Sequence, residues 1–131
     1  MLYLWIMLGS ALGGAGRYWF SGFVANRIGE TFPWGTIFVN ISGCFVIGFF
    51  ATLTGPDGRL LVGTTARQFV MVGLCGGYTT FSSFSLQTLT LVQDGEWARA
   101  AANVGLSVVL CFVAVWLGHI AASMLNQLKG V

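Results

Sequence analysis

The sequence predicts an all-α membrane protein, a single domain of four transmembrane helices over residues 1–131. Hydrophobic residues make up 56% of the chain and charged residues only 8%, whereas a soluble domain carries roughly 25% charged residues. A bilayer core about 30 Å thick needs around 20 apolar residues per helix. The chain contains four such stretches, and the short connectors between them hold most of the charges. Because no soluble domain is left over, we expect the function to reside in the membrane.

The four spans are expected at about residues 2–24, 34–53, 69–92 and 100–122. The first is expected to be retained rather than cleaved as a signal peptide. It has no positively charged leading region, and its apolar stretch continues into Trp19 and Phe20. The connector between the second and third spans contains Gly-Pro-Asp-Gly at residues 55–58, which is a turn signature.

Positive charges are balanced between the two sides of the membrane. With four helices both termini share one side, which also holds the connector after the second span. That side carries Arg59, Arg67 and Lys129, and the opposite side carries Arg27 and Arg99, with Arg17 nearer to it. The positive-inside rule therefore favours neither orientation, and two copies could insert in opposite directions and pair antiparallel, like the inverted repeats of many transporters. The alternative is that one arginine near a boundary sets a single orientation.

The acidic residues all lie in connectors: Glu30, Asp57, Asp94 and Glu96. Proton-coupled pumps and cation exporters usually place a carboxylate at membrane depth, so the sequence argues against proton coupling and against an organic-cation substrate. It contains no acid–base pair and no nucleophile–base arrangement, and we expect no enzyme activity. The net charge of +2 and the lack of a basic run argue against nucleic-acid binding.

Three cysteines, Cys44, Cys75 and Cys111, each lie within an apolar stretch. None belongs to a CxxC motif or has a histidine beside it in the sequence. We therefore expect buried free thiols, with neither a metal site nor a disulfide framework.

Three polar residues within the spans each allow two interpretations. Arg17 either attracts anions at a vestibule or extends its charge to the interface. Asn40 in the second span either donates a hydrogen bond to a passing anion or bonds a neighbouring helix. His119, near the far end of the fourth span, is expected to be a boundary residue rather than a proton relay.

The third span contains the most unusual pattern, two adjacent glycines, Gly76 and Gly77, followed closely by Thr79 and Thr80. Glycine costs about 1 kcal/mol relative to alanine in a helix interior, so the pair favours a break near the middle of the span. A break frees backbone groups that protein, water or an ion must satisfy, and transport proteins build ion sites at such breaks.

The alternative is a glycine-mediated helix crossing, because residues 73 and 77 form a GxxxG motif, as do residues 9 and 13. That interpretation leaves unexplained the hydroxyl cluster Thr79, Thr80, Ser82, Ser83, Ser85 and Thr88. Phe81 and Phe84 are three residues apart and share a helix face. Their ring edges are electropositive, so with hydroxyls and an amide they could solvate a small anion weakly enough for it to leave. Alone, they would be packing residues.

Three segments together carry a resemblance: GGYTTFSSFS at residues 76–85, VNISG at 39–43 and GGAGRY at 13–18. They resemble the fluoride channels of the Fluc (CrcB) family. The resemblance covers nearly the whole chain, with four spans, the same motif order and a similar length. The third-span motif is the specific part, and the fourth span matches least.

The resemblance implies an antiparallel homodimer in membrane lipid with two pores, each lined by both subunits. It implies that the edges of Phe81 and Phe84 meet fluoride and that Asn40 donates a hydrogen bond to it. Ser82 and Ser83 match the hydroxyl region beside the pore.

Further residues are assigned by the same resemblance. The carbonyls of Gly76 and Thr79 match those that hold a structural sodium ion at the dimer centre, four carbonyl dipoles around a hard cation. Arg17 matches the family's first-span arginine, and Asn103 and Ser107 are the polar candidates of the fourth span.

The function implied is passive, fluoride-selective conduction in the plasma (inner) membrane of a prokaryote. Cells gain fluoride as hydrogen fluoride, which ionises inside, so a passive leak of the anion exports it and lowers cytoplasmic fluoride. Two other classes stay open. One is a small dual-topology multidrug exporter, against which the first span's lack of a carboxylate argues. The other is a non-transporting membrane subunit that uses its glycine faces for assembly.

Overall fold

The computed structural model describes residues 1–128 and is helical throughout, with short connectors and no strand in that range. Lys129, which entered the charge balance, lies outside the described residues. The first, second and fourth predicted spans correspond to α1 (Leu2–Ile28), α2 (Trp34–Leu53) and α6 (Trp97–Gln127). The third is a broken helix made of α3 (Thr64–Gln68), the π-helical η1 (Phe69–Cys75), α4 (Gly76–Tyr78) and α5 (Phe81–Gln93). The all-α prediction is confirmed.

Three helical segments of residues 1–128 are long and apolar enough to cross a membrane: Trp34–Leu53, Thr64–Gln93 and Trp97–Gln127. Helix α1 is not among them. With 27 residues it is long enough, but its glycines, tyrosines, tryptophans and Arg17 make it less apolar. It extends past the predicted end of its span, and α6 extends past both predicted ends, because helical hydrogen bonding continues where the apolar pattern stops.

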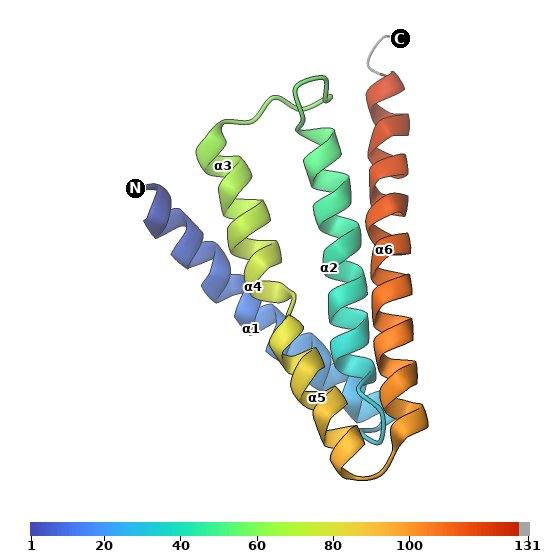
Figure 1. Cartoon of the computed structure of the whole chain (residues 1–131). Helices are drawn as coiled ribbons and strands as arrows, with labels where there is room; N and C mark the ends of the chain where they lie inside the picture. Colours follow the sequence, from blue (N-terminus) through green and yellow to red (C-terminus); the bar gives the residue numbers. More distant parts are fainter. Residues whose placement is uncertain (129–131) are drawn as a thin grey trace.

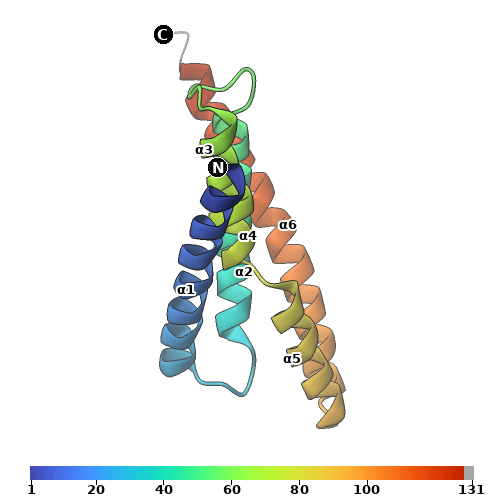
Figure 2. The same cartoon turned by 90° about the vertical axis from the view of Figure 1, so that its left-hand side faces the viewer.

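The elements form a splayed bundle whose helices are inclined to one another. Figure 1 shows α2 and α6 running in the same direction side by side, with α1 crossing obliquely and α3 to α4 lying against it. The N-terminus, the end of α6 and the connector between α2 and α3 share one end of the bundle. Figure 2 shows α5 and the adjoining part of α6 leaning away from the C-terminal half of α1.

Glycines allow α1 to approach the first half of the broken helix. A Cβ atom on Gly73 would lie 3.0 Å from the Cα atom of Gly9, and one on Gly77 would lie 2.6 Å from the carbonyl oxygen of Ser10. A Cβ atom on Gly13 would collide with the carbonyl oxygen of Leu74. Both GxxxG motifs therefore meet at one crossing, which confirms the interpretation of these glycines as packing residues.

Glycines also allow close approach between α2 and α6. A Cβ atom on Gly48 would collide with the carbonyl oxygen of Val115, and one on Gly118 would collide with that of Phe45. One turn beyond Gly48, the Thr52 Oγ1 and His119 Nδ1 atoms are 2.8 Å apart. His119 thus joins two helices near the C-terminal end of α2.

Candidate functional site

The third span breaks at Thr79 and Thr80, two residues later than the Gly76–Gly77 pair where we expected it. Thr79 has φ −77° and ψ 156°, Thr80 has φ −150° and ψ 114°, and α5 begins at Phe81. Gly76 and Gly77 both remain helical. The expected position was wrong because Gly77 is held by packing against α1, whereas the threonine side chains can replace helical hydrogen bonds.

Side chains stabilise the break. Thr80 Oγ1 accepts a hydrogen bond of 3.1 Å from the Ser83 N–H and so caps α5. Thr79 Oγ1 donates to the Cys75 carbonyl at 2.9 Å. Asn40 pairs twice with the Thr80 backbone: its Nδ2 donates to the carbonyl at 3.0 Å, and its Oδ1 accepts from the N–H at 2.8 Å. The Asn40 side chain of α2 thus supplies the hydrogen-bond partners that a backbone peptide group would otherwise provide.

This pairing decides how Asn40 is used. The helix–helix hydrogen bond considered from the sequence is present. A carboxamide has two N–H donors, and within residues 1–128 Thr80 accepts only one bond from Nδ2. The second N–H is left for the cavity that Asn40 lines. The structural role and the anion-donor role are therefore compatible.

The break leaves the carbonyls of Gly76 and Thr79 without their helical donors. In a continuous α-helix they would accept from the N–H groups of Thr80 and Ser83. Those N–H groups bond instead to Asn40 Oδ1 and Thr80 Oγ1. Within the described residues no other backbone N–H bonds to either carbonyl. Both are therefore free to bind an ion or water.

An inner cavity of about 430 Å³ lies beside the break, between α2, α5 and α6. It is lined by Asn40, Thr79, Thr80, Phe81, Phe84 and Ser107, among others. The Phe81 and Phe84 rings contact edge to face, with centroids 5.3 Å apart. Phe84 is 8% exposed, whereas Phe81 is 77% exposed. Both predicted rings thus reach the cavity, one from the protein interior and one from its open side.

The polar residues of the fourth span connect α6 to α5. Asn103 Nδ2 donates to Thr88 Oγ1 at 2.9 Å, and Ser107 Oγ donates to Asn103 Oδ1 at 3.4 Å. Asn103 is fully buried and Ser107 nearly so. Ser107 lines the inner cavity. Asn103 does not line it, but its hydrogen bonds connect Ser107 to Thr88.

A second cavity, also of about 430 Å³, lies on the other side of α5. Its lining includes Arg17, Thr36, Thr80, Ser83 and Gln87. The structure therefore separates two residues predicted to act together, because Ser83 faces this cavity and Phe84 faces the inner one. Thr80 lines both cavities, at the point where the helix breaks.

Arg17 and Ser82 lie at the edges of these cavities. Arg17 is partly exposed and makes no ion pair with any residue from 1 to 128. Ser82 is exposed, and its Oγ atom lies 3.3 Å from Thr80 Oγ1. Arg17 can therefore offer an unneutralised charge to an anion in the second cavity. Ser82 belongs to the cluster of hydroxyl side chains at the break.

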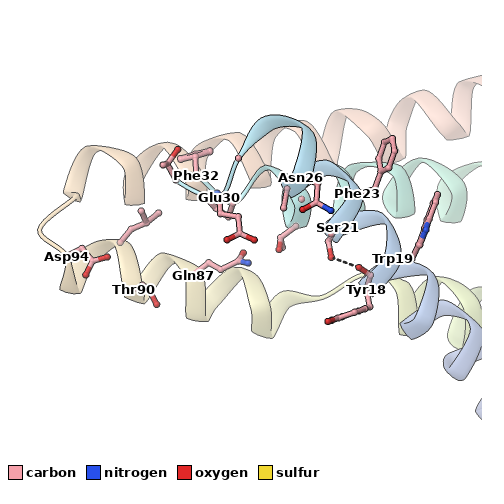
Figure 3. A pocket seen from close by; sticks show the side chains of 18 residues that line it. Tyr18, Trp19, Ser21, Phe23, Asn26, Glu30, Phe32, Gln87, Thr90 and Asp94 are labelled. Atoms are coloured by element: carbon pink, nitrogen blue, oxygen red, sulfur yellow. Dashed lines mark hydrogen bonds between the residues drawn. The ribbon is translucent and has the colours of Figure 1, made fainter.

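A third, open cavity of about 980 Å³ lies between the C-terminal part of α1, the connector after it, and α5. In Figure 3 the Glu30 carboxylate points toward Gln87, and Ser21 Oγ donates to the Tyr18 carbonyl. Glu30 and Asp94 both line this cavity, and their charges repel anions. The two smaller cavities contain no carboxylate in their linings, so an anion site fits there better.

Comparison with known proteins assigns the family. A family model described as CrcB-like protein, Camphor Resistance (CrcB), matches residues 4–119. The chain belongs to this family. It is 64% identical over 130 residues to the fluoride-specific ion channel FluC of Methylocella silvestris, covering 99% of each chain. It is 67% identical over 129 residues to that of Opitutus terrae, covering 98% of each, and 62% identical over 127 residues to that of Rhodospirillum rubrum. With three span-length apolar helices, this CrcB chain is an integral membrane protein.

Sequence reasoning missed two cavity residues in this CrcB chain. Thr36 and Gln87 both line the second cavity, and the Gln87 Oε1 atom is buried without a hydrogen-bond partner in residues 1–128. Gln87 lies four residues after Ser83, so it continues the face of α5 that lines the second cavity. Its polar side chain at helical spacing from Ser83 could have identified it from the sequence.

Proposed function

We infer that this chain is the subunit of a fluoride-specific ion channel, which lets fluoride cross the membrane passively. The observation that carries this function is the identity of 62–67% to three channels of that name over nearly the whole chain. The site is chemically compatible, because neutral polar groups and two phenylalanine rings line the inner cavity and no carboxylate does. Ion channels are not enzymes, and no covalent step is needed.

The inner cavity would hold fluoride weakly. The ring edges of Phe84 and Phe81 and the spare N–H of Asn40 replace part of the ion's hydration shell. None of them carries a full charge, so the ion can leave again. Arg17 lines the second cavity, from which its charge attracts the anion toward the break.

We propose that the pore is completed by a second, antiparallel copy. The exposed Phe81 ring stands beside an open cavity, which supports a partner surface there. Arginines occur at both ends of the bundle, Arg59 and Arg67 at one and Arg27 and Arg99 at the other, which supports dual insertion. A C-terminal reporter that is active on only one side of the membrane should give signal for both orientations. A single orientation would eliminate the antiparallel arrangement.

We also propose a structural sodium ion at the dimer centre. The freed carbonyls of Gly76 and Thr79 suit a hard cation, and two chains would supply four of them. The ion would supply positive charge that holds these carbonyl dipoles in place. Replacing sodium by a large organic cation on both sides should abolish fluoride flux. Unchanged flux would eliminate this ion as a structural element.

The flux is driven by the fluoride gradient and the membrane potential. Hydrogen fluoride enters a cell and ionises inside, so a passive path in the plasma membrane exports the anion and lowers cytoplasmic fluoride.

The deciding experiment is fluoride efflux from liposomes that contain the purified protein, measured with a fluoride electrode after an ionophore clamps the potential. We expect rapid fluoride release and no comparable chloride release. A non-transporting subunit would release neither ion. A multidrug exporter would instead move organic cations in exchange for protons.

A further inference from the structure

Two of the three thiols are brought together by the fold, although they are far apart in the sequence. Cys44 lies on α2 and Cys111 on α6, and both line the inner cavity. Cys75 lines the same cavity but is buried at 5% exposure, whereas Cys44 and Cys111 are partly accessible. The cavity thus has two reachable thiols on adjoining walls.

The register of α2 against α6 places these thiols opposite each other. Gly48 packs against Val115, and Thr52 lies beside His119. Cys44 and Cys111 are each one turn before the first of these pairs, at the same spacing along the two parallel helices. The thiols are near enough to interact. The close approach at Gly48 holds the two helices together next to them.

We propose that Cys44 and Cys111 form a two-thiol site for a soft divalent cation that prefers two-coordinate linear geometry, of which the mercuric ion is the type. The step is a ligand exchange without change of oxidation state. The two S–H bonds break and their protons leave to solvent, while two metal–sulfur bonds replace the bonds from the metal to two water or chloride ligands, which are released.

Charge favours this ion over a monovalent soft cation. Two thiolates and one divalent cation give a neutral complex, which is the form least penalised in a low-dielectric wall. A monovalent cation would leave one net negative charge there.

The site lacks the ligands that zinc requires. Zinc sites usually have four nitrogen, sulfur or oxygen ligands. Within residues 1–128 no three side chains of His, Cys, Asp or Glu are placed to hold a metal ion together. Selectivity for the linear ion therefore follows from the ligand number.

The position of the site predicts an effect on transport, a consequence that rests on the proposed channel function. Cys111 follows Ser107 by one helical turn, and Cys44 follows Asn40 by one turn, all lining the same cavity. A metal bridge there would occupy space and remove two mobile thiol protons from the wall that fluoride passes. We expect bound mercury to reduce fluoride efflux.

The test is titration of the reduced, purified full-length protein with mercuric chloride, followed by the mercury–thiolate charge-transfer absorbance. We expect one tightly bound ion per subunit. Cys44→Ser and Cys111→Ser should each weaken binding about a hundredfold or more, because the second thiol acts at a high effective concentration. The matched control, Cys75→Ser, should retain the tight site, and zinc should not compete.

Equal affinity in Cys44→Ser or Cys111→Ser would overturn the inference, as would loss of the tight site in Cys75→Ser. Size-exclusion profiles establish that each variant is folded. If a serine variant does not fold, brief oxidation of the wild-type chain gives an independent readout. A Cys44–Cys111 disulfide in the digested protein is expected, and its absence would refute their proximity.

Efflux measurements separate this inference from the channel proposal. Mercury should slow wild-type efflux, and excess dithiol should restore it. Tight mercury binding by a protein with no metal-free fluoride flux would refute only the channel. Normal flux without a paired-thiol site would refute only the metal site.

Discussion

The α2–α6 pair and the break between α4 and α5 differ in how they satisfy close packing and hydrogen bonding in lipid. In the pair, both helices are continuous, and Gly48 and Gly118 let the backbones touch. At the break, the backbone is opened, and Asn40 and Thr80 supply the missing partners. Substitutions in the pair are therefore limited by side-chain size, whereas substitutions at the break are limited by the ability of the side chain to form hydrogen bonds. Substitutions that preserve one property and change the other test this contrast.

The largest effect is expected for Phe84→Leu, which keeps an apolar side chain of similar bulk but removes the ring edge. Such swaps usually cost under about 1.5 kcal/mol of stability, so assembly should persist. Fluoride efflux should fall by orders of magnitude, because the dehydrated anion loses polar solvation on the order of several kcal/mol. Proteoliposome efflux measures it.

Phe81→Leu is the comparison for that experiment. Phe81 is largely exposed in the single chain, and its ring should also be needed for flux once a partner covers it. A folded, dimeric Phe84→Leu protein with normal efflux would refute the role of the ring edge and leave Phe84 as a packing residue.

Next in size is Asn40→Leu. The substitution leaves the Thr80 N–H and carbonyl unpaired, and each buried unsatisfied group costs about 1–3 kcal/mol. We expect a lower thermal midpoint and impaired flux together. Asn40→Asp is the matched variant, since it keeps the acceptor for the Thr80 N–H but adds a negative charge. It should impair flux even where the fold survives. Wild-type flux in Asn40→Asp would contradict the donor role.

A smaller effect is expected for Gly118→Ala in the helix pair. Its new Cβ atom would collide with the Phe45 carbonyl and lie 2.9 Å from the Phe49 nitrogen. Overpacking of this kind costs about 1–3 kcal/mol. The control is Gly105→Ala on the same helix, where no atom lies within 4 Å. Thermal unfolding in detergent should separate the two, and equal midpoints would mean that the pair tolerates added size.

The smallest effect is expected for Thr80→Val, which removes the N-cap of α5 while keeping the shape of the side chain. Loss of a cap costs about 1 kcal/mol, so the thermal midpoint should drop slightly. Thr80→Ser keeps the hydroxyl and should behave like the wild type. A drop of the same size in Thr80→Ser would show that the methyl group, not the cap, stabilises the break.

Much of the fold could be predicted from the sequence because it depends on single segments. The span-length apolar stretches gave helices α1, α2 and α6, and residues 76–85 indicated a break in the third span. The break was displaced to Thr79 and Thr80 because side-chain hydrogen bonds and the contact of Gly77 with α1 decide its position. Neither of these contacts can be recognised from the local sequence pattern.

The candidate site could be predicted only as a set of residues. The sequence marked Asn40, Phe84 and Ser83 but could not show that Ser83 faces a different cavity from Phe84. It also gave no reason to expect Cys44 and Cys111 to lie close to each other. Helical periodicity tells which residues share a face of one helix, and it says nothing about which faces of distant helices meet.

The sequence by itself determined a membrane-embedded helical chain with no carboxylate within its predicted spans and a polar, glycine-containing interruption in the third. Only the tertiary structure decided that Asn40 completes that interruption, that two carbonyls are freed there, and that two thiols meet across α2 and α6. The physical reason is that these contacts depend on how closely the helices approach. In lipid that approach is set by which glycines face one another, a property of pairs of helices rather than of any one segment.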